Sequence, residues 1–163
     1  MRKLFFILLA ALTVGLYAGE TQAPVKFRVG FGGGFEAGNG LRLGVKQGSE
    51  TVELGLGLLY DAADANLRYS TGLRYLHDLY NGRLNDTYAW TGAGVFGRSR
   101  SGAGYVVSAG AGLGLALHFG LPFHFNLDSG WRLYYDTYPH LWGDSYKKIQ
   151  TGPTINGALI YEW

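Results

Sequence analysis

The chain ends on a run in which apolar and polar positions alternate, and this run stops on an aromatic residue. Apolar side chains or glycine occupy every second position from Ile155 to Trp163. An alternation of period two predicts a β-strand with one apolar face. A strand at the end of a chain leaves an edge of unpaired backbone groups, which closed barrels remove by pairing the last strand with the first. We therefore expect a closed β-barrel whose last strand is this segment.

The same alternation recurs along the rest of the sequence. Glycine-rich or polar turns separate the alternating runs, with Asn81-Gly82 as the clearest hairpin signal. The predicted strands span residues 26–36, 41–47, 51–60, 66–75, 86–97, 105–119, 123–136 and 150–163. Eight strands joined by short turns predict an all-β fold, an eight-stranded antiparallel up-and-down β-barrel.

The two faces of these strands differ in charge and in bulk. A soluble barrel also alternates, but it places the apolar face inside. Here the apolar face carries most of the large side chains, whereas the other face carries glycines and charges. The charged members of that face are Arg28, Glu36, Glu53, Arg68, Arg74, Asp128, Arg132 and Asp136. A narrow lumen suits glycines and paired charges, and lipid suits rows of Leu, Phe and Tyr. We expect a transmembrane barrel with these charges in an interior network; a secreted soluble barrel is the alternative.

The strand at 86–97 leaves its facing open. Tyr88, Trp90 and Phe96 share one parity, but alanine and valine occupy several positions of the other. A large ring near each end of a strand suits the aromatic belts at the two membrane interfaces. We therefore expect these three aromatic side chains to face outward.

The N-terminal segment has the features of a secretory signal peptide. Arg2 and Lys3 precede an apolar stretch, and small residues follow at Ala18 and Gly19. We expect a signal peptide over residues 1–18, cleaved near Ala18 or Gly19, and a barrel domain over residues 24–163.

The chain has no cysteine, which excludes a disulfide and a lipid-anchored cysteine. Without Arg2 and Lys3 the 12 remaining basic residues equal the 12 acidic ones, so no basic excess favours nucleic acid as a partner.

With these features the chain resembles the small eight-stranded outer-membrane β-barrels of Gram-negative bacteria, the OmpA/OmpX-like type. The most specific part of the resemblance is the C-terminal strand, in which Leu159, Tyr161 and Trp163 resemble the signal that the barrel-insertion machinery reads. The resemblance implies a location in the bacterial outer membrane, termini in the periplasm, and contact with membrane lipid and lipopolysaccharide. Relatives have long extracellular loops, whereas here only residues 138–148 form a sizeable loop. An adhesin or phage-receptor role is therefore not carried over.

The segment from Trp131 to Tyr146, with Lys147 and Lys148 after it, includes that loop and holds the richest local cluster of aromatic side chains. Its candidate contacts to a lipopolysaccharide headgroup or a glycan are Tyr138, His140, Trp142, Lys147 and Lys148. Ring faces and hydrogen-bonding groups suit sugars, and the lysines suit phosphates. An aromatic belt with lysines that reach toward the interface explains the same residues, and we favour that interpretation.

No motif in the sequence predicts catalysis. The four histidines lack the fixed offsets of paired metal ligands, and none lies in the His-x-Ser arrangement of the lipid A deacylases. The glycine runs lie inside predicted strands with no helix after them, so they do not form nucleotide-binding loops. We expect no catalytic, metal or cofactor-binding residues and no enzymatic activity.

The predicted function is a structural or surface-interaction role in the cell envelope, with a further envelope protein as a partner that the sequence does not name. Two alternatives remain open: a narrow channel or conduit for small ions or apolar molecules, and an enzyme that modifies lipid A.

Overall fold

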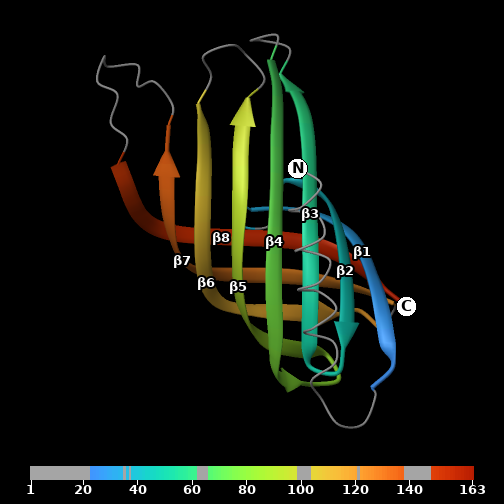
Figure 1. The fold of residues 1–163 in the computed structure, drawn as a ribbon. Coiled ribbons are helices and arrows are strands. Elements are labelled where there is room, and N and C mark those ends of the chain that lie inside the picture. Colours follow the sequence, from blue (N-terminus) through green and yellow to red (C-terminus); the bar gives the residue numbers. More distant parts are fainter. Residues whose placement is uncertain are drawn as a thin grey trace.

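The computed structural model describes residues 23–34, 36, 38–61, 66–98, 104–120, 122–137 and 148–163. These residues form β1 (Val25–Gly33), β2 (Gly40–Gln47), β3 (Glu50–Asp61), β4 (Asn66–Asn81), β5 (Asn85–Arg98), β6 (Tyr105–His118), β7 (Phe123–Asp136) and β8 (Lys148–Glu162). Each strand pairs antiparallel with the next, and β8 pairs with β1, so the sheet closes into a barrel (Figure 1). The predicted up-and-down barrel of eight antiparallel strands is confirmed. In this part of the chain no helix is both long and apolar enough to cross a membrane.

The last strand closes the barrel as its alternation predicts. The β1–β8 register runs from Arg28 opposite Glu162 to Gly33 opposite Gly157. Trp163 adds two backbone hydrogen bonds with Phe27, at 2.9 and 3.1 Å between nitrogen and oxygen. The end of the chain is therefore paired up to its final residue.

The barrel has two different ends. At one, which we call the turn end, tight connections at 48–49, 82–84 and 119–122 join the strands, and β1 begins and β8 ends there. This end lies toward the lower right in Figure 1; at the opposite end, which we call the loop end, β1, β3, β5 and β7 end and β2, β4, β6 and β8 begin. β4 continues to Asn81, beyond the predicted end at Tyr75, with a register shift between Asp78 and Tyr80 that marks a β-bulge.

The first strand ends three residues earlier than predicted. Glu36 lies in a turn and not on β1, and its side chain is fully buried. Gly34 and Gly38 on either side have φ angles of +148° and +71°, which side chains rarely tolerate. Asn39 Oδ1 accepts a hydrogen bond from the Gly34 backbone N–H at 2.8 Å and so holds the turn. Glu36 is therefore carried to an interior position by a turn.

The expectation for the facing of the fifth strand is wrong. Tyr88 and Trp90 are only 2% and 3% exposed and point into the barrel, and the other parity of β5 faces outward. The reason lies on the neighbouring strand, because Tyr88 is opposite Gly114 and Trp90 is opposite Gly112. A Cβ atom at Gly114 would overlap the Tyr88 ring. Gly114 on β6 thus leaves the space that the Tyr88 ring fills.

The polarity of the barrel is the inverse of that of a soluble protein. Large apolar side chains are exposed on the outer wall of every strand except β5 in the described part of the chain. Buried charged side chains lie inside, and they include Arg28, Arg42, Glu53, Arg74 and Asp128. The polar lumen is therefore the interior of this molecule, and only small apolar clusters such as that around Leu76 and Trp90 are buried with it.

Candidate functional site in the barrel lumen

A single carboxylate joins three arginines near the middle of the lumen. Glu53 on β3 lies 3.0 Å from Arg28, 3.7 Å from Arg42 and 3.8 Å from Arg74, measured between side-chain nitrogen and oxygen. The strand register brings these residues together: Arg28 on β1 is opposite Gly44 on β2, Gly44 is opposite Glu53 on β3, and Glu53 is opposite Arg74 on β4. Gly44 has no side chain to separate its neighbours, so Arg28 and Glu53 meet across it.

Asp128 on β7 forms the second centre of this network. Its Oδ2 accepts hydrogen bonds from Arg74 Nη2 at 2.8 Å and from the Tyr88 hydroxyl at 3.0 Å. Its Oδ1 accepts a hydrogen bond from Asn156 Nδ2 at 2.6 Å. The Arg74 guanidinium also lies 4.9 Å from the centre of the Trp90 ring, a cation–π distance. Arg74 therefore bridges Glu53 and Asp128, and side chains from opposite walls converge in the middle of the barrel.

The eight predicted interior charges do not form one cluster. Arg28, Glu53, Arg74 and Asp128 belong to the central network. Glu36 is buried apart from it and accepts a hydrogen bond from the Thr154 hydroxyl at 2.8 Å. The remaining three lie nearer the loop end and are partly exposed: Arg68, Arg132 and Asp136.

Sequence reasoning missed several members of the network. Arg42 shares the inward parity of its strand but was not predicted as part of the network, and Tyr88 was expected to face outward. Asn156 is uncharged, so a search for charges overlooks it. The alternation could have identified Arg42 and Asn156, because both occupy inward-facing positions of their strands.

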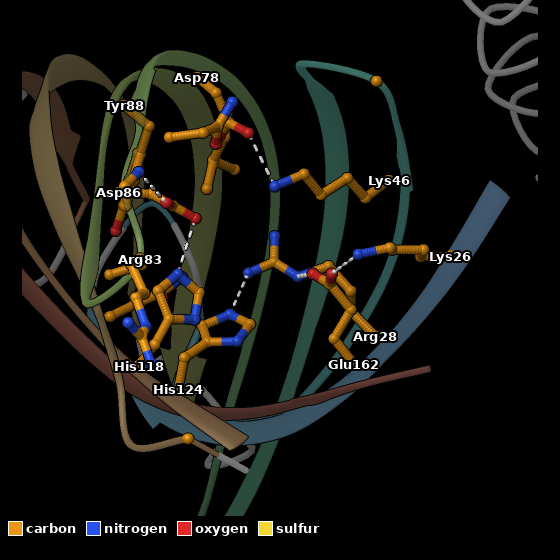
Figure 2. Close-up of a pocket in the computed structure, with 17 residues that line it drawn as sticks. Lys26, Arg28, Lys46, Asp78, Arg83, Asp86, Tyr88, His118, His124 and Glu162 are labelled. Atoms are coloured by element: carbon orange, nitrogen blue, oxygen red, sulfur yellow. Dashed lines mark hydrogen bonds and ion pairs between the residues drawn. The ribbon is translucent and has the colours of Figure 1, made fainter. Parts of the chain in front are cut away.

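A cavity of about 480 Å³ opens on the turn end, and we call it the vestibule (Figure 2). Two ion pairs line its wall, Lys26 with Glu162 at 2.9 Å and Lys46 with Asp78 at 2.7 Å, and His118 Nε2 forms a hydrogen bond with Asp86 Oδ2 at 2.8 Å. Arg28 extends from the central network into the vestibule, where Figure 2 shows it beside His124 and Glu162. The lumen is thus open at the turn end as far as the level of Arg28.

The histidines are divided between the two sides of the wall. His118 and His124 line the vestibule. His77 lies on the outer wall, where its Nδ1 is 2.8 Å from Glu50 Oε1 and the Tyr75 hydroxyl donates to the other oxygen of Glu50. Among the described residues, no group of three or more His, Asp or Glu side chains is arranged to hold a metal ion.

The three residues of the predicted insertion signal lie on the outer wall at the turn end. Leu159 and Trp163 are exposed, and the Tyr161 ring centre lies 5.5 Å from that of Trp163 and 4.9 Å from that of Phe123. Phe27 extends this aromatic cluster, 6.1 Å from Trp163. Recognition of these residues by an insertion machinery stays a prediction.

Several predicted residues fall outside the described part of the chain. They are the signal peptide over residues 1–18 and four of the candidate headgroup contacts, namely Tyr138, His140, Trp142 and Lys147. Lys148 begins β8, but its side chain is not described.

Comparison with known proteins gives little similarity. No protein-family model matches the chain, and no curated protein matches it. Among solved structures, the chain is similar to the crystal structure of a major outer membrane protein from Thermus thermophilus, with a TM-score of 0.41. The identity is 14%, and the similarity covers 86% of this chain and 100% of that one.

Proposed function

We propose that this protein is an integral outer-membrane β-barrel with a closed lumen and a non-enzymatic role, either structural or in surface contacts of the cell envelope. The observation that carries the proposal is the inverse polarity of the barrel. Phe31, Leu58 and Ile155 are 71–72% exposed, whereas Glu53 and Arg74 are 2% exposed. In water this outer wall would leave large apolar areas hydrated, at about 25 cal/mol for each Å². A bilayer removes that cost.

The dimensions of the barrel support the same placement. A transmembrane β-strand needs about 9–11 residues, and β5, β6 and β7 have 14 residues each. These three strands, together with β3, β4 and β8 of 12, 16 and 15 residues, are long enough to cross a bilayer and to extend beyond it, whereas β1 and β2 have 9 and 8 residues. The aromatic cluster of Phe27, Phe123, Tyr161 and Trp163 lies at the turn end, where an interfacial belt is expected. With the turn end toward the periplasm, the longer connections would face the lipopolysaccharide leaflet.

The central network supports a lumen that does not conduct. Arg28, Glu53, Arg74 and Asp128 are at most 6% exposed, and they connect β1, β3, β4 and β7. An eight-stranded barrel leaves a lumen only wide enough for side chains to fill. The vestibule reaches this network at Arg28, so the narrow-channel alternative would require the network to separate.

One observation favours the lipid-modifying alternative enough to include it in the test. His77 faces the outer wall and is held by Glu50, an arrangement that can orient an imidazole toward lipid. Catalysis by covalent transfer also needs a nucleophile within hydrogen-bond reach of that imidazole. Among the described residues, the hydrogen-bond partner of the His77 imidazole is the Glu50 carboxylate and not a hydroxyl nucleophile, so we adopt an interfacial polar cluster as the explanation.

Heat-modifiability of the purified, detergent-folded protein tests the proposal. We expect the unboiled protein to migrate faster than the boiled protein on a gel, and to give a β-type circular dichroism spectrum. Reconstituted in planar bilayers, it should show no regular conductance steps, and its expression should leave the lipid A mass spectrum unchanged. A protein that stays monomeric in water without detergent would contradict the membrane placement. Conductance steps, or a lipid A mass change that the His77→Ala variant abolishes, would contradict the assigned role.

A further inference from the structure

We propose that the vestibule binds a small, water-soluble organic anion, a polar molecule of about hexose size that carries a phosphate or carboxylate group. This inference goes beyond the envelope role, because it assigns a ligand to the lumen. The first support is size and access. The cavity of about 480 Å³ lies inside the ring of strands and opens at the turn end. Small-molecule sites fall within about 300–1,000 Å³, so the vestibule exceeds what a few waters need.

The charges that line the vestibule favour an anion. The four cationic side chains are Lys26, Arg28, Lys46 and Arg83, and the three carboxylates are Asp78, Asp86 and Glu162. Each carboxylate already has a cation or an imidazole as its partner, as described above. Arg83 lies in the turn between β4 and β5 at the mouth and lines the vestibule. Within the described residues it forms no ion pair, so its guanidinium is available for an incoming anion.

The imidazole of His124 supplies a further donor. Arg28 Nη2 lies 2.8 Å from His124 Nε2, and a guanidinium can only donate. His124 Nε2 therefore accepts, and in this arrangement the ring proton is on Nδ1. The His118 ring lies next to it, with 5.4 Å between the two ring centres. An N–H donor of His124 thus belongs to the wall of a cavity whose carboxylates are already paired.

Asn126 is the strongest sign of a missing partner. Its side chain is 2% exposed and lines the vestibule, and its Oδ1 has no hydrogen-bond partner among the described residues. Its neighbours in the register are Ala116 on β6 and Ala158 on β8, and neither has a polar side chain to offer. A buried amide oxygen without a hydrogen-bond partner is costly to stability. A hydroxyl-bearing ligand would donate to this oxygen while its anionic group contacts Arg83.

Isothermal titration calorimetry on the detergent-folded protein tests the proposal with three probes of similar size: glucose 6-phosphate, glucuronate and glucose. We expect heat from one or both of the anions and none from glucose, and which anion binds identifies the preferred group. Arg83→Gln should weaken binding about tenfold, the loss of one charge-assisted contact. Asn126→Leu removes the buried amide without adding a charge, and should weaken binding by roughly three- to tenfold.

Arg68→Gln is the matched control, because it removes the same charge from the loop end of the barrel. We expect its affinity to equal that of the unmodified protein. NMR of the unmodified protein gives a second readout, in which the anion should shift the His118 and His124 ring signals. The proposal is overturned if neither anion binds at millimolar concentration, if glucose binds equally well, or if Arg68→Gln weakens binding as much as Arg83→Gln.

Discussion

Glu53 shows how one residue controls the balance of charge in the lumen. It is the shared counter-charge of Arg28, Arg42 and Arg74, and it is almost fully buried. A buried ion pair adds little to stability relative to apolar residues of the same volume, but the loss of one partner is costly because the other charge stays buried. The network therefore adds little net stability, but the loss of any one of its charged members is destabilising.

We predict that Glu53→Gln lowers the free energy of unfolding by about 3–5 kcal/mol, because three buried guanidiniums lose the carboxylate that they share, while Arg28 keeps Glu162 and Arg74 keeps Asp128. Urea titration of the protein in lipid vesicles, followed by tryptophan fluorescence, measures the change. Glu50→Gln is the control on the same strand, since Glu50 is 38% exposed and should lose no more than about 1 kcal/mol.

A double variant separates charge imbalance from lost hydrogen bonds. Removing Arg42 together with the carboxylate, as Arg42→Gln with Glu53→Gln, takes one uncompensated cation away. We expect the double variant to be more stable than Glu53→Gln alone, since contacting residues are not additive. A double variant whose loss equals the sum of the two single losses would contradict a shared charge balance.

At the scale of the element, alternation was sufficient for most strands and insufficient for β5. It located the strands and the inward parity of Arg28, Glu53 and Arg74 from the sequence. It failed at β5 because both parities there carry apolar side chains. The deciding information lies on β6, whose Gly112 and Gly114 face Trp90 and Tyr88. That pairing depends on the register, which the sequence of a single strand does not contain.

The position of Glu36 was beyond alternation for a different reason. A period of two continues through residue 36, so the pattern extends the strand as far as Glu36. The structure ends β1 at Gly33, and glycines with positive φ then turn the chain into the lumen. Glycine is compatible with both a strand and such a turn. The vestibule was also not predictable. A cavity forms where several strands place small side chains at the same level of the lumen, and that level depends on the register between the strands.

The fit between β5 and β6 leads to a prediction on one glycine. Gly114→Ala should lower the free energy of unfolding by about 1–3 kcal/mol, because its Cβ would overlap the Tyr88 ring. Gly152→Ala is the control, since a Cβ there has no atom within 4 Å. Its effect should stay below about 1 kcal/mol. Urea titration in vesicles measures both, and equal effects would mean that Tyr88 does not occupy the space opposite Gly114.

At the scale of the whole molecule, the barrel combines a charged network across its lumen with a vestibule at the turn end. The central network joins opposite walls, whereas the vestibule leaves the turn end accessible to solvent. In a through-channel, a ligand that enters the lumen can also pass through it; here binding and passage are separate properties. Ligand binding in the vestibule requires no passage through the barrel, so an anion site and a non-conducting lumen are compatible.

The outer wall provides the sharpest test of what surrounds the molecule. Ile155 lies at the middle of β8 and is 72% exposed. In a bilayer, Ile155→Lys would place a cation near the midplane and should lower the free energy of unfolding from vesicles by about 2–4 kcal/mol. Thr151→Lys lies on the same face of the same strand, nearer its loop end, and should cost no more than about 1 kcal/mol.

The comparison of these two variants distinguishes lipid from water directly. Around a barrel in water, a lysine in place of either exposed side chain would be neutral or favourable, because neither side chain is packed. Around a barrel in lipid, the cost must fall as the lysine moves from the middle of the strand toward its end. Equal stability of the Ile155→Lys and unmodified proteins would therefore reject the membrane placement, whereas a graded loss would locate the bilayer midplane near Ile155.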